Sequence, residues 1–422
     1  MEYKKEILET YNLHTVYTDN FKECRFEINF RENVTKDNYL KCIFLNDILT
    51  YSTKNNPRRK DMVIKSEELY QVQIYGNTTR LGKAVNLSIG CNFINPEYAK
   101  EDNYLEDVIE FVTDIIFNPN IKDNRFDETS FNIVKNDLIS NFETLKESPM
   151  RVASFNAFNM LEDNSATKIF LDNYTKDDIL DITSEDIYNF YKEVLEHFIC
   201  DVIIVGDLKF DKISKLVQKY IKLRTIKNHK VDLYEENLQR KKVLMKKDVS
   251  TFNQTTLLLA YNLIDLTDKE RIYVMHIFDY IFCNGGFKSK LFKSLREDNS
   301  LCYGVSSFYM KFDKMYGLKV SLAKENVKKA IKLINKSLKE MNVASFEDDL
   351  IDEAKKSILN TLKTSNDAIY SFTNECFLRE IDGFPPITER MKAYRKITKE
   401  EIANVSKKLK ANLVYVLEDG AR

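Results

Sequence analysis

The sequence repeats itself at long range, and this repeat constrains the possible folds more than any other feature. The segment that begins near Asp37 superposes on the segment that begins near Glu270, at a constant offset of 233 residues. In each copy an apolar helical pattern is followed by a tyrosine (Tyr70 or Tyr303), by a polar alternating strand, and by a second strand that starts fourteen residues after the tyrosine. Self-similarity at a fixed long period is typical of repeated architecture. The sequence therefore predicts two homologous units.

The remainder of each repeat places helices and strands in the same order. An amphipathic helical pattern follows the second strand, more helix comes after it, and each repeat ends with a helix that leads into a β-branched strand. The corresponding segments are 101–117 and 324–341 for the amphipathic helix, and 184–208 and 398–418 for the final helix and strand. This order predicts an α+β fold, in which each α/β unit packs a mostly antiparallel sheet against helices.

The two predicted units are joined by a stretch with the composition of a linker. Residues 222–247 are rich in charge and poor in core residues. The predicted boundaries are therefore 1–221 for the N-terminal unit, 222–247 for the linker and 248–422 for the C-terminal unit.

Charge and cysteine content bound the surroundings of the protein. Lys plus Arg number 64 and Asp plus Glu number 65, so no global field draws the chain to nucleic acid or to an anionic membrane. No apolar run approaches the roughly 20 residues of a membrane helix, and the first twenty residues contain no signal-peptide pattern. The seven cysteines are dispersed without a CxxC pair, which suits a reducing compartment. We expect a cytoplasmic protein with no nucleic-acid or membrane partner.

The most specific local segment of the sequence lies in the second repeat. From Asn284 to Phe308 it reads NGGFKSKLFKSLREDNSLCYGVSSF, which combines a small-residue loop, an Arg-Glu pair and a tyrosine seven residues after the arginine. With the two tandem units, this segment resembles the insulinase/pitrilysin-type zinc peptidases, which include the mitochondrial processing peptidases and bacterial relatives. The resemblance covers essentially the whole chain. It implies that the two units form half of a peptidase chamber.

The metal-binding motif of that family is degenerate here. Active members carry His-x-x-Glu-His on the first helix, where one helical turn brings two imidazoles to one zinc ion and the glutamate acts as general base. The corresponding residues in this chain are Ile43, Asn46 and Asp47, and the helix of the third ligand offers Asp137 but no glutamate. No two of the histidines share a helical turn; they are His14, His197, His229 and His276. The resemblance therefore implies that this chain holds no zinc.

Two other residues match positions that matter in two-chain members of the family. There one subunit carries the zinc motif, and the other contributes an arginine and a tyrosine to the same chamber. Arg296 and Tyr303 match these positions. Arginine presents a planar fork of donors to carbonyl or carboxylate oxygens, and a tyrosine hydroxyl can donate to a developing oxyanion. The alternative is ordinary: a solvated arginine and a tyrosine packed at the start of a strand, as we expect for Tyr70, which has Val63 in place of a matching arginine.

These observations predict a non-catalytic, substrate-binding subunit of a heterodimeric zinc peptidase or peptide-processing complex. Arg296 and Tyr303 would contribute to the active site of a homologous partner that carries the zinc, and the isolated chain would be inactive. An extended peptide would add to a sheet edge, for which the strand Val85–Ile89 is a candidate. As a chain of this length without the zinc motif, the protein resembles bacterial members of the family that are associated with elongation factor P modification or with bacteriocin maturation. Two alternatives are a scaffold with no role in proteolysis and an autonomous peptidase with a non-standard metal site.

Overall fold

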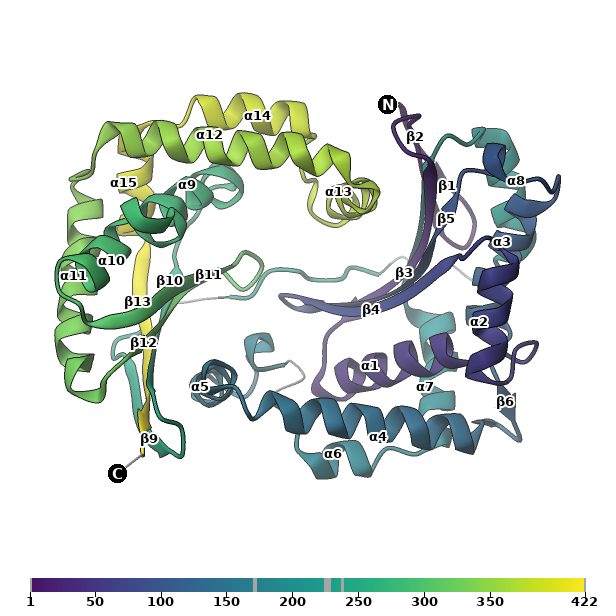
Figure 1. The fold of residues 1–422 in the computed structure, drawn as a ribbon, viewed down its shortest axis with the longest axis horizontal. Helices are drawn as coiled ribbons and strands as arrows, with labels where there is room; N and C mark the ends of the chain where they lie inside the picture. Colours follow the sequence, from purple (N-terminus) through teal and green to yellow (C-terminus); the bar gives the residue numbers. More distant parts are fainter. Residues whose placement is uncertain (1, 170–172, 224–228, 237–238, 421–422) are drawn as a thin grey trace. The chain divides into compact units, whose positions relative to one another are not determined.

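The chain forms two compact units, which we describe one at a time in a computed structural model (Figure 1). The structure describes residues 2–169, 173–223, 229–236 and 239–420. Unit 1 comprises Met1–Phe142, Ile169–Leu233 and Ser365–Phe384, and unit 2 comprises Glu143–Lys168, Tyr234–Thr364 and Pro385–Arg422.

Unit 1 is built on a six-stranded sheet with the strand order β1-β2-β8-β3-β5-β4. All neighbouring strands are antiparallel except β2 and β8. The strands are β1 (Glu2–Ile7), β2 (Asn12–Tyr17), β3 (Glu23–Asn33), β4 (Gln73–Leu81), β5 (Ala84–Ile94) and β8 (Ile199–Gly206), and a separate hairpin joins β6 (Ile121–Lys122) to β7 (Arg125–Phe126).

Strict alternation along β3 gives this sheet one apolar and one polar face. Cys24, Phe26, Ile28 and Phe30 point into the main core of the unit, which is formed with helices that include α1, α3 and α7. The opposite face is covered in part by α13, which packs on β8 and β3. The helices of unit 1 are α1 (Lys36–Tyr51), α2 (Arg59–Glu68), η1 (Pro96–Tyr98), α3 (Tyr104–Phe117), α4 (Glu128–Leu145, in unit 1 as far as Phe142), α6 (Lys176–Leu180), α7 (Ser184–His197), α8 (Phe210–Tyr220), η9 (Ser365–Asp367) and α13 (Ile369–Asp382).

Unit 2 contains a five-stranded sheet with the order β11-β12-β10-β13-β9. Its core lies between this sheet and the helices that follow β10. The strands are β9 (Leu244–Ser250), β10 (Thr255–Leu263), β11 (Cys302–Met310), β12 (Met315–Leu322) and β13 (Leu409–Asp419). The helical segments are α5 (Pro149–Phe158), η2 (Ala166–Lys168), η4 (Glu270–Val274), α9 (Met275–Asp279), η5 (Tyr280–Asn284), η6 (Gly286–Lys288), α10 (Lys290–Phe292), η7 (Lys293–Glu297), η8 (Lys324–Asn326), α11 (Val327–Asn342), α12 (Asp348–Thr364), α14 (Ile387–Arg395) and α15 (Lys399–Lys407).

The two sheets repeat the same order, which confirms the predicted fold class of two homologous α+β units. The strands β2, β8, β3, β5 and β4 of unit 1 correspond to β9, β13, β10, β12 and β11 of unit 2. Local chemistry repeats as well, because α7 and α15 each begin with a capping box, Thr183 with Asp186 and Thr398 with Glu401. Among the described residues, only the main sheet of unit 1 has an additional strand, β1, and only in unit 1 does a helix, α8, follow the last strand of the shared order.

Each unit also contains a helix from the other half of the sequence. The helix α5, from the first repeat, packs on β10 and β13 in unit 2, whereas α13, from the second repeat, packs on β3 and β8 in unit 1. Since β10 corresponds to β3 and β13 to β8, the exchange is reciprocal. The predicted boundaries divided the chain linearly and did not anticipate it. The predicted linker 222–247 overlaps the start of β9, and its residues 224–228 and 237–238 lie outside the described residues.

Two details of the predicted repeat differ in the structure. The strand Val85–Ile89 is not an edge: it lies within β5, which is buried and paired on both sides, to β3 and to β4. The prediction of an exposed strand there was wrong, because alternation alone does not show how many neighbours a strand has. The edge strands on this side of the two sheets are β4 and β11.

Tyr70 and Tyr303 are not structurally equivalent either. Tyr70 lies in the turn after α2 with a positive φ of 60°, whereas Tyr303 lies within β11. The 233-residue offset of the sequence repeat therefore does not pair structurally equivalent residues here. The reason is that the turn between β4 and β5 is shorter than the turn between β11 and β12.

Candidate functional site

The residues at the zinc-motif positions lie on α1 of unit 1, where Ile43 and Asp47 are one helical turn apart and half-buried. Asn46 is buried behind them against the edge strand β4. A Cβ at Gly76 of that strand would lie 2.0 Å from Asn46 Oδ1, so the side chain of Asn46 occupies the space that glycine leaves open. The Asn46 position is thus packed against the sheet.

Asp47 carries the one ionisable group among these three positions. Burial raises the pKa of the Asp47 carboxyl to about 6; the hydrogen bond from Asn46 Nδ2 (3.4 Å) opposes this shift, and the nearby charge of Asp137 adds to it. The charge of Asp137 on α4 therefore acts on Asp47 of α1, and these residues stand at the positions that the resemblance gives to the second and third ligands. An isoleucine and an amide complete the set, however, and neither replaces an imidazole as a zinc ligand. Within the described part of the chain, no group of three or more His, Cys, Asp or Glu side chains could hold a metal ion.

Three of the four histidines are engaged in separate places. His14 contacts Asp201 and Tyr3, His229 Nε2 lies 2.6 Å from Glu32 Oε2, and His276 Nδ1 lies 2.6 Å from the Tyr394 hydroxyl. No two of these three share a partner, so the structure offers no zinc ligand pair among them. His276 contacts the rings of Tyr309 and Tyr394.

Arg296 is exposed on η7, a π-helical turn in unit 2. Its guanidinium lies over the ring of Phe292 at 5.1 Å from the ring centroid, and Phe292 in turn contacts Phe287 edge to face at 5.0 Å. Among the described residues, Arg296 forms no ion pair, so its five donors are available to another molecule. This exposure is also what the alternative, a solvated arginine, predicts.

Tyr303 lies next to the same segment, on the edge strand β11, which packs against η7. The pairing of β11 with β12 shifts register between Cys302 and Gly304, and Tyr303 is the unpaired residue of this bulge. Bulges redirect a side chain out of the regular ladder, and Tyr303 is 70% exposed. Its hydroxyl has no hydrogen-bond partner among the described residues. The alternative of a half-buried packing tyrosine describes Tyr70 instead, whose hydroxyl donates to Glu101 Oε2 at 2.7 Å.

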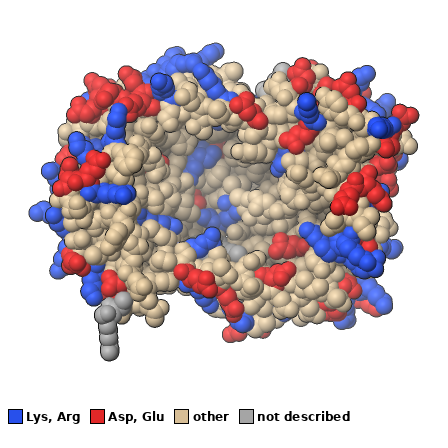
Figure 2. Space-filling view, viewed as in Figure 1, with Lys and Arg blue, Asp and Glu red and all other residues tan. Residues whose placement is uncertain are grey.

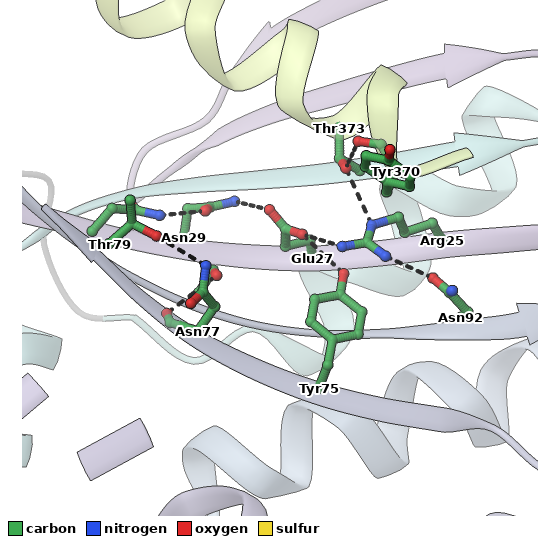
Figure 3. A network of polar contacts seen from close by, with 11 residues as sticks. Arg25, Glu27, Asn29, Tyr75, Asn77, Thr79, Asn92, Tyr370 and Thr373 are labelled. Atoms are coloured by element: carbon green, nitrogen blue, oxygen red, sulfur yellow. Dashed lines mark hydrogen bonds and ion pairs between the residues drawn. The ribbon is translucent and has the colours of Figure 1, made fainter. Parts of the chain in front are cut away.

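Sequence reasoning missed a polar network on the second face of the unit 1 sheet (Figure 3). Glu27 Oε2 accepts hydrogen bonds from Arg25 and from the Tyr75 hydroxyl, both at 2.9 Å. Arg25 also donates to Asn92 Oδ1 (2.9 Å) and to Thr373 Oγ1 (3.1 Å), and stacks over the ring of Tyr75. Burial and the charge of Glu27 raise the pKa of Tyr75, so its hydroxyl stays protonated as a donor. The network therefore ties α13 to β3 and leaves few donors free for a ligand.

A second buried cluster lies further along the same face. Asp201 is fully buried and is contacted by Asn12 (2.8 Å), His14 (3.4 Å) and Arg31 (3.2 Å). Burial alone raises the pKa of Asp201, but the hydrogen bond from His14, the charge of Arg31 and the hydrogen bond from Asn12 outweigh it and lower the pKa. The alternation Arg25-x-Glu27-x-Asn29-x-Arg31 in the sequence is the signal that could have revealed this polar face.

Comparison with known proteins confirms the predicted resemblance. The family model described as "Peptidase M16 inactive domain" matches residues 181–358. The chain is also 24% identical over 414 residues to a protein of Bacillus subtilis (strain 168) named "Probable inactive metalloprotease YmfF", a match that covers 96% of this chain and 95% of that protein. The name of the Bacillus subtilis protein, whose match includes α1, accords with the degenerate motif there, whereas the residues matched by the family model lie after α1.

Solved structures show the same fold at low sequence identity. A conserved protein from Enterococcus faecalis V583 matches with a TM-score of 0.94 at 21% identity and covers 100% of this chain and 99% of that chain. A peptidase M16 inactive domain from Pseudomonas fluorescens matches with a TM-score of 0.79 at 14% identity over 100% and 98% of the two chains. The periplasmic protease PqqL from Escherichia coli matches with a TM-score of 0.74 at 14% identity, over 99% of this chain and 46% of that chain. In the described part of the present chain, no helix is both long and apolar enough to span a membrane.

Proposed function

We propose that this chain is the non-catalytic, substrate-binding subunit of a two-chain zinc peptidase. The observation that carries the proposal is the pair Arg296 and Tyr303. Both are exposed on adjoining elements of unit 2, and neither has an ion pair or side-chain hydrogen bond among the described residues. Their donors therefore face solvent, unlike those of Arg25 and Tyr75 in unit 1, which are bonded within the fold.

The two side chains suit different tasks at a peptide bond under attack. The fork of Arg296 can hold a main-chain carbonyl or a carboxylate of the peptide in two hydrogen bonds. The hydroxyl of Tyr303 can donate to the oxygen on which negative charge develops. The partner chain would hold the zinc on its own His-x-x-Glu-His helix and activate the attacking water molecule. Ile43, Asn46 and Asp47, which stand at these positions in the present chain, do not fit a zinc ion.

The edge strands offer a binding mode for the peptide itself. Both β4 and β11 have one unpaired side within the described residues, so an extended peptide could add to either strand by main-chain hydrogen bonds. We favour β11, because it carries Tyr303. A cytoplasmic location accords with the seven cysteines, all of which are free and buried in the structure.

The first experiment isolates the chain from its native source together with its stable partner and measures peptide cleavage by the complex. We expect a chain of similar length that carries His-x-x-Glu-His in equal amount. Replacement Tyr303→Phe should lower kcat about 100-fold, the loss typical of removing one oxyanion donor, and Arg296→Ala should raise KM for the peptide. Tyr70→Phe and Lys293→Ala are matched controls, since they alter a bonded tyrosine and an exposed cation on the same π-helical turn.

Two results would contradict the proposal. One is a preparation in which the chain associates only with itself and no zinc-bearing protein is present. The other is an active complex whose kcat/KM is unchanged in the Arg296→Ala, Tyr303→Phe double variant, which would favour a scaffold that uses the same fold.

A further inference from the structure

The two units differ in how the outer face of one corresponding helix is covered. The helices α3 and α11 follow β5 and β12, which are equivalent strands. Their buried positions align in phase: Val108, Val112 and Ile115 of α3 match Ala330, Ile334 and Ser337 of α11. In this alignment, each acidic residue of α3 corresponds to a lysine of α11. The corresponding pairs are Glu106 and Lys328, Asp107 and Lys329, Glu110 and Lys332, and Asp114 and Lys336. The outer faces of the two helices therefore carry opposite charge.

In unit 1 the acidic helix is covered by α8. Lys219 of α8 forms an ion pair with Glu106, and the Tyr220 hydroxyl donates to the same carboxylate at 2.9 Å. In this setting Ile109 and Thr113 of α3 are 0% and 2% exposed. A basic amphipathic helix on an acidic one is thus the arrangement that this fold uses to close this face.

In unit 2 no described residue closes the corresponding face of α11. Ile331, which matches the buried Ile109, is only half-buried, and Asn335, which matches the buried Thr113, is exposed. The face forms a shallow groove of about 530 Å³, lined by Lys328, Ile331, Lys332, Leu333, Asn335, Lys336 and Lys339. Within the described residues, the single ion pair formed by these lysines joins Lys336 to Glu340 at 3.9 Å.

The lysines of α11 are spaced unfavourably for a face that meets only water. Lys328, Lys332 and Lys336 follow one another at intervals of four residues, and like charges at this spacing destabilise a helix by a few tenths of a kcal/mol per pair. On the face of the molecule drawn in Figure 2, basic and acidic side chains both occur, in groups of either sign. An unbroken basic row beside a half-buried isoleucine therefore indicates a face that meets an acidic surface.

We propose that the outer face of α11 is the docking site for an amphipathic helix of a partner protein, with acidic residues along its edges. The helix would pack its apolar stripe on Ile331 and place Asp or Glu side chains beside the lysines, in the way α8 packs on α3 with the charges inverted. Charge complementarity selects this occupant over a basic or neutral helix. The proposal does not depend on the function proposed above, because it concerns neither Arg296 nor Tyr303.

The test uses a peptide derived from α8 as a probe for the full-length protein. The peptide spans residues 209–221, carries Lys212→Glu and Lys219→Glu, and is held helical by a hydrocarbon staple between the exposed positions 211 and 215. A second peptide with the native lysines and the same staple serves as the control. Fluorescence anisotropy measures the affinity of each peptide for three proteins: the wild type and two double variants. The α11 variant carries Lys328→Glu and Lys332→Glu. The α12 variant, which is the control, carries Lys356→Glu and Lys363→Glu at a matched pair of exposed lysines.

The expected result is binding of the acidic peptide to the wild-type protein and to the α12 variant, with at least tenfold weaker binding to the α11 variant. Binding should also weaken as salt is raised from 50 to 500 mM, because the pairs lie near the surface. The charge-reversed α11 variant should bind the basic peptide better than the wild type does. Equal binding of the two peptides, no binding of the acidic peptide, or equal affinity for the α11 and α12 variants would each overturn the proposal. Circular dichroism of the variants checks that both pairs of substitutions leave the fold intact.

Discussion

Unit 1 and unit 2 share a sheet order, but the polar side chains that stand out in each unit differ in how they are bonded. In unit 1 the charged side chains on the sheet are bonded to one another: Arg25 to Glu27, and Arg31 to Asp201. In unit 2 the notable polar side chains, Arg296 and Tyr303, are exposed and have no such partners within the described residues. The comparison teaches that a duplicated fold does not duplicate a site, because a site depends on which polar groups are left unsatisfied by the fold itself.

The motif positions show the same division. The helix α1 of unit 1 holds the degenerate zinc positions, and its Asn46 and Asp47 are packed or partly desolvated. In unit 2, a bulge on the edge strand β11 turns Tyr303 outward. Three substitutions test whether unit 1 is structural in the way this comparison requires.

The largest effect on stability should come from Asp201, the buried acid of unit 1. Asp201→Asn leaves Arg31 without its counter-charge and should lower the free energy of unfolding by about 3 kcal/mol. Because the folded-state pKa of Asp201 is lowered, its stabilising contribution is present above the unfolded pKa of about 4 and is lost as the pH falls further. The urea midpoint of the wild type should therefore fall toward that of the variant below pH 4.

A compensating change serves as the control for this prediction. Arg31→Leu in the Asp201→Asn background removes the unpaired cation and should recover part of the lost stability. An Asp201→Asn variant as stable as the wild type at pH 7 would show that the buried cluster does not hold the unit 1 sheet together.

Two glycines on the corresponding edge strands give a direct contrast between the units. An added Cβ at Gly76 meets Asn46 at 2.0 Å, whereas an added Cβ at Gly304 of unit 2 meets no atom within 4 Å. Gly76→Ala should therefore destabilise the protein by about 1–3 kcal/mol through overpacking. Gly304→Ala should be neutral or slightly stabilising, by about 0.5 kcal/mol, because it restricts the unfolded chain. Urea unfolding of the two variants side by side measures the difference, and equal effects would contradict the packing of Asn46 against β4.

The smallest effect concerns Asp47, and its sign is opposite to that of Asp201. A raised folded-state pKa of about 6 means that ionised Asp47 opposes folding once the pH exceeds its unfolded pKa of about 4, and the full penalty is present above pH 6. Asp47→Asn should thus stabilise the protein by about 1–2 kcal/mol at pH 7.5 and by almost nothing at pH 4. Unfolding midpoints at the two pH values provide the measurement. A stabilisation of the same size at both values would show that the effect arises from packing and not from charge.

The local patterns of the sequence were sufficient for the repeat, the fold class and the degenerate motif. Periodicity of two and of 3.6 residues reports which face of an element is buried, and it is read from neighbours in the chain. The substitution of Ile43, Asn46 and Asp47 for metal ligands is likewise visible residue by residue. The alternation in β3 was equally visible, although its polar face is covered in part by α13.

The remaining features depended on contacts between residues far apart in the chain. Only strand pairing showed that β5 is central, that β4 and β11 are edges, and that Tyr303 lies at a bulge. Only tertiary packing assigned α5 to unit 2 and α13 to unit 1, because the pattern of a helix does not show which of two homologous sheets it will meet. The sequence by itself thus determined which elements form and which face of each is apolar, whereas the structure decided which surfaces meet, since that choice rests on long-range burial and on the satisfaction of buried polar groups.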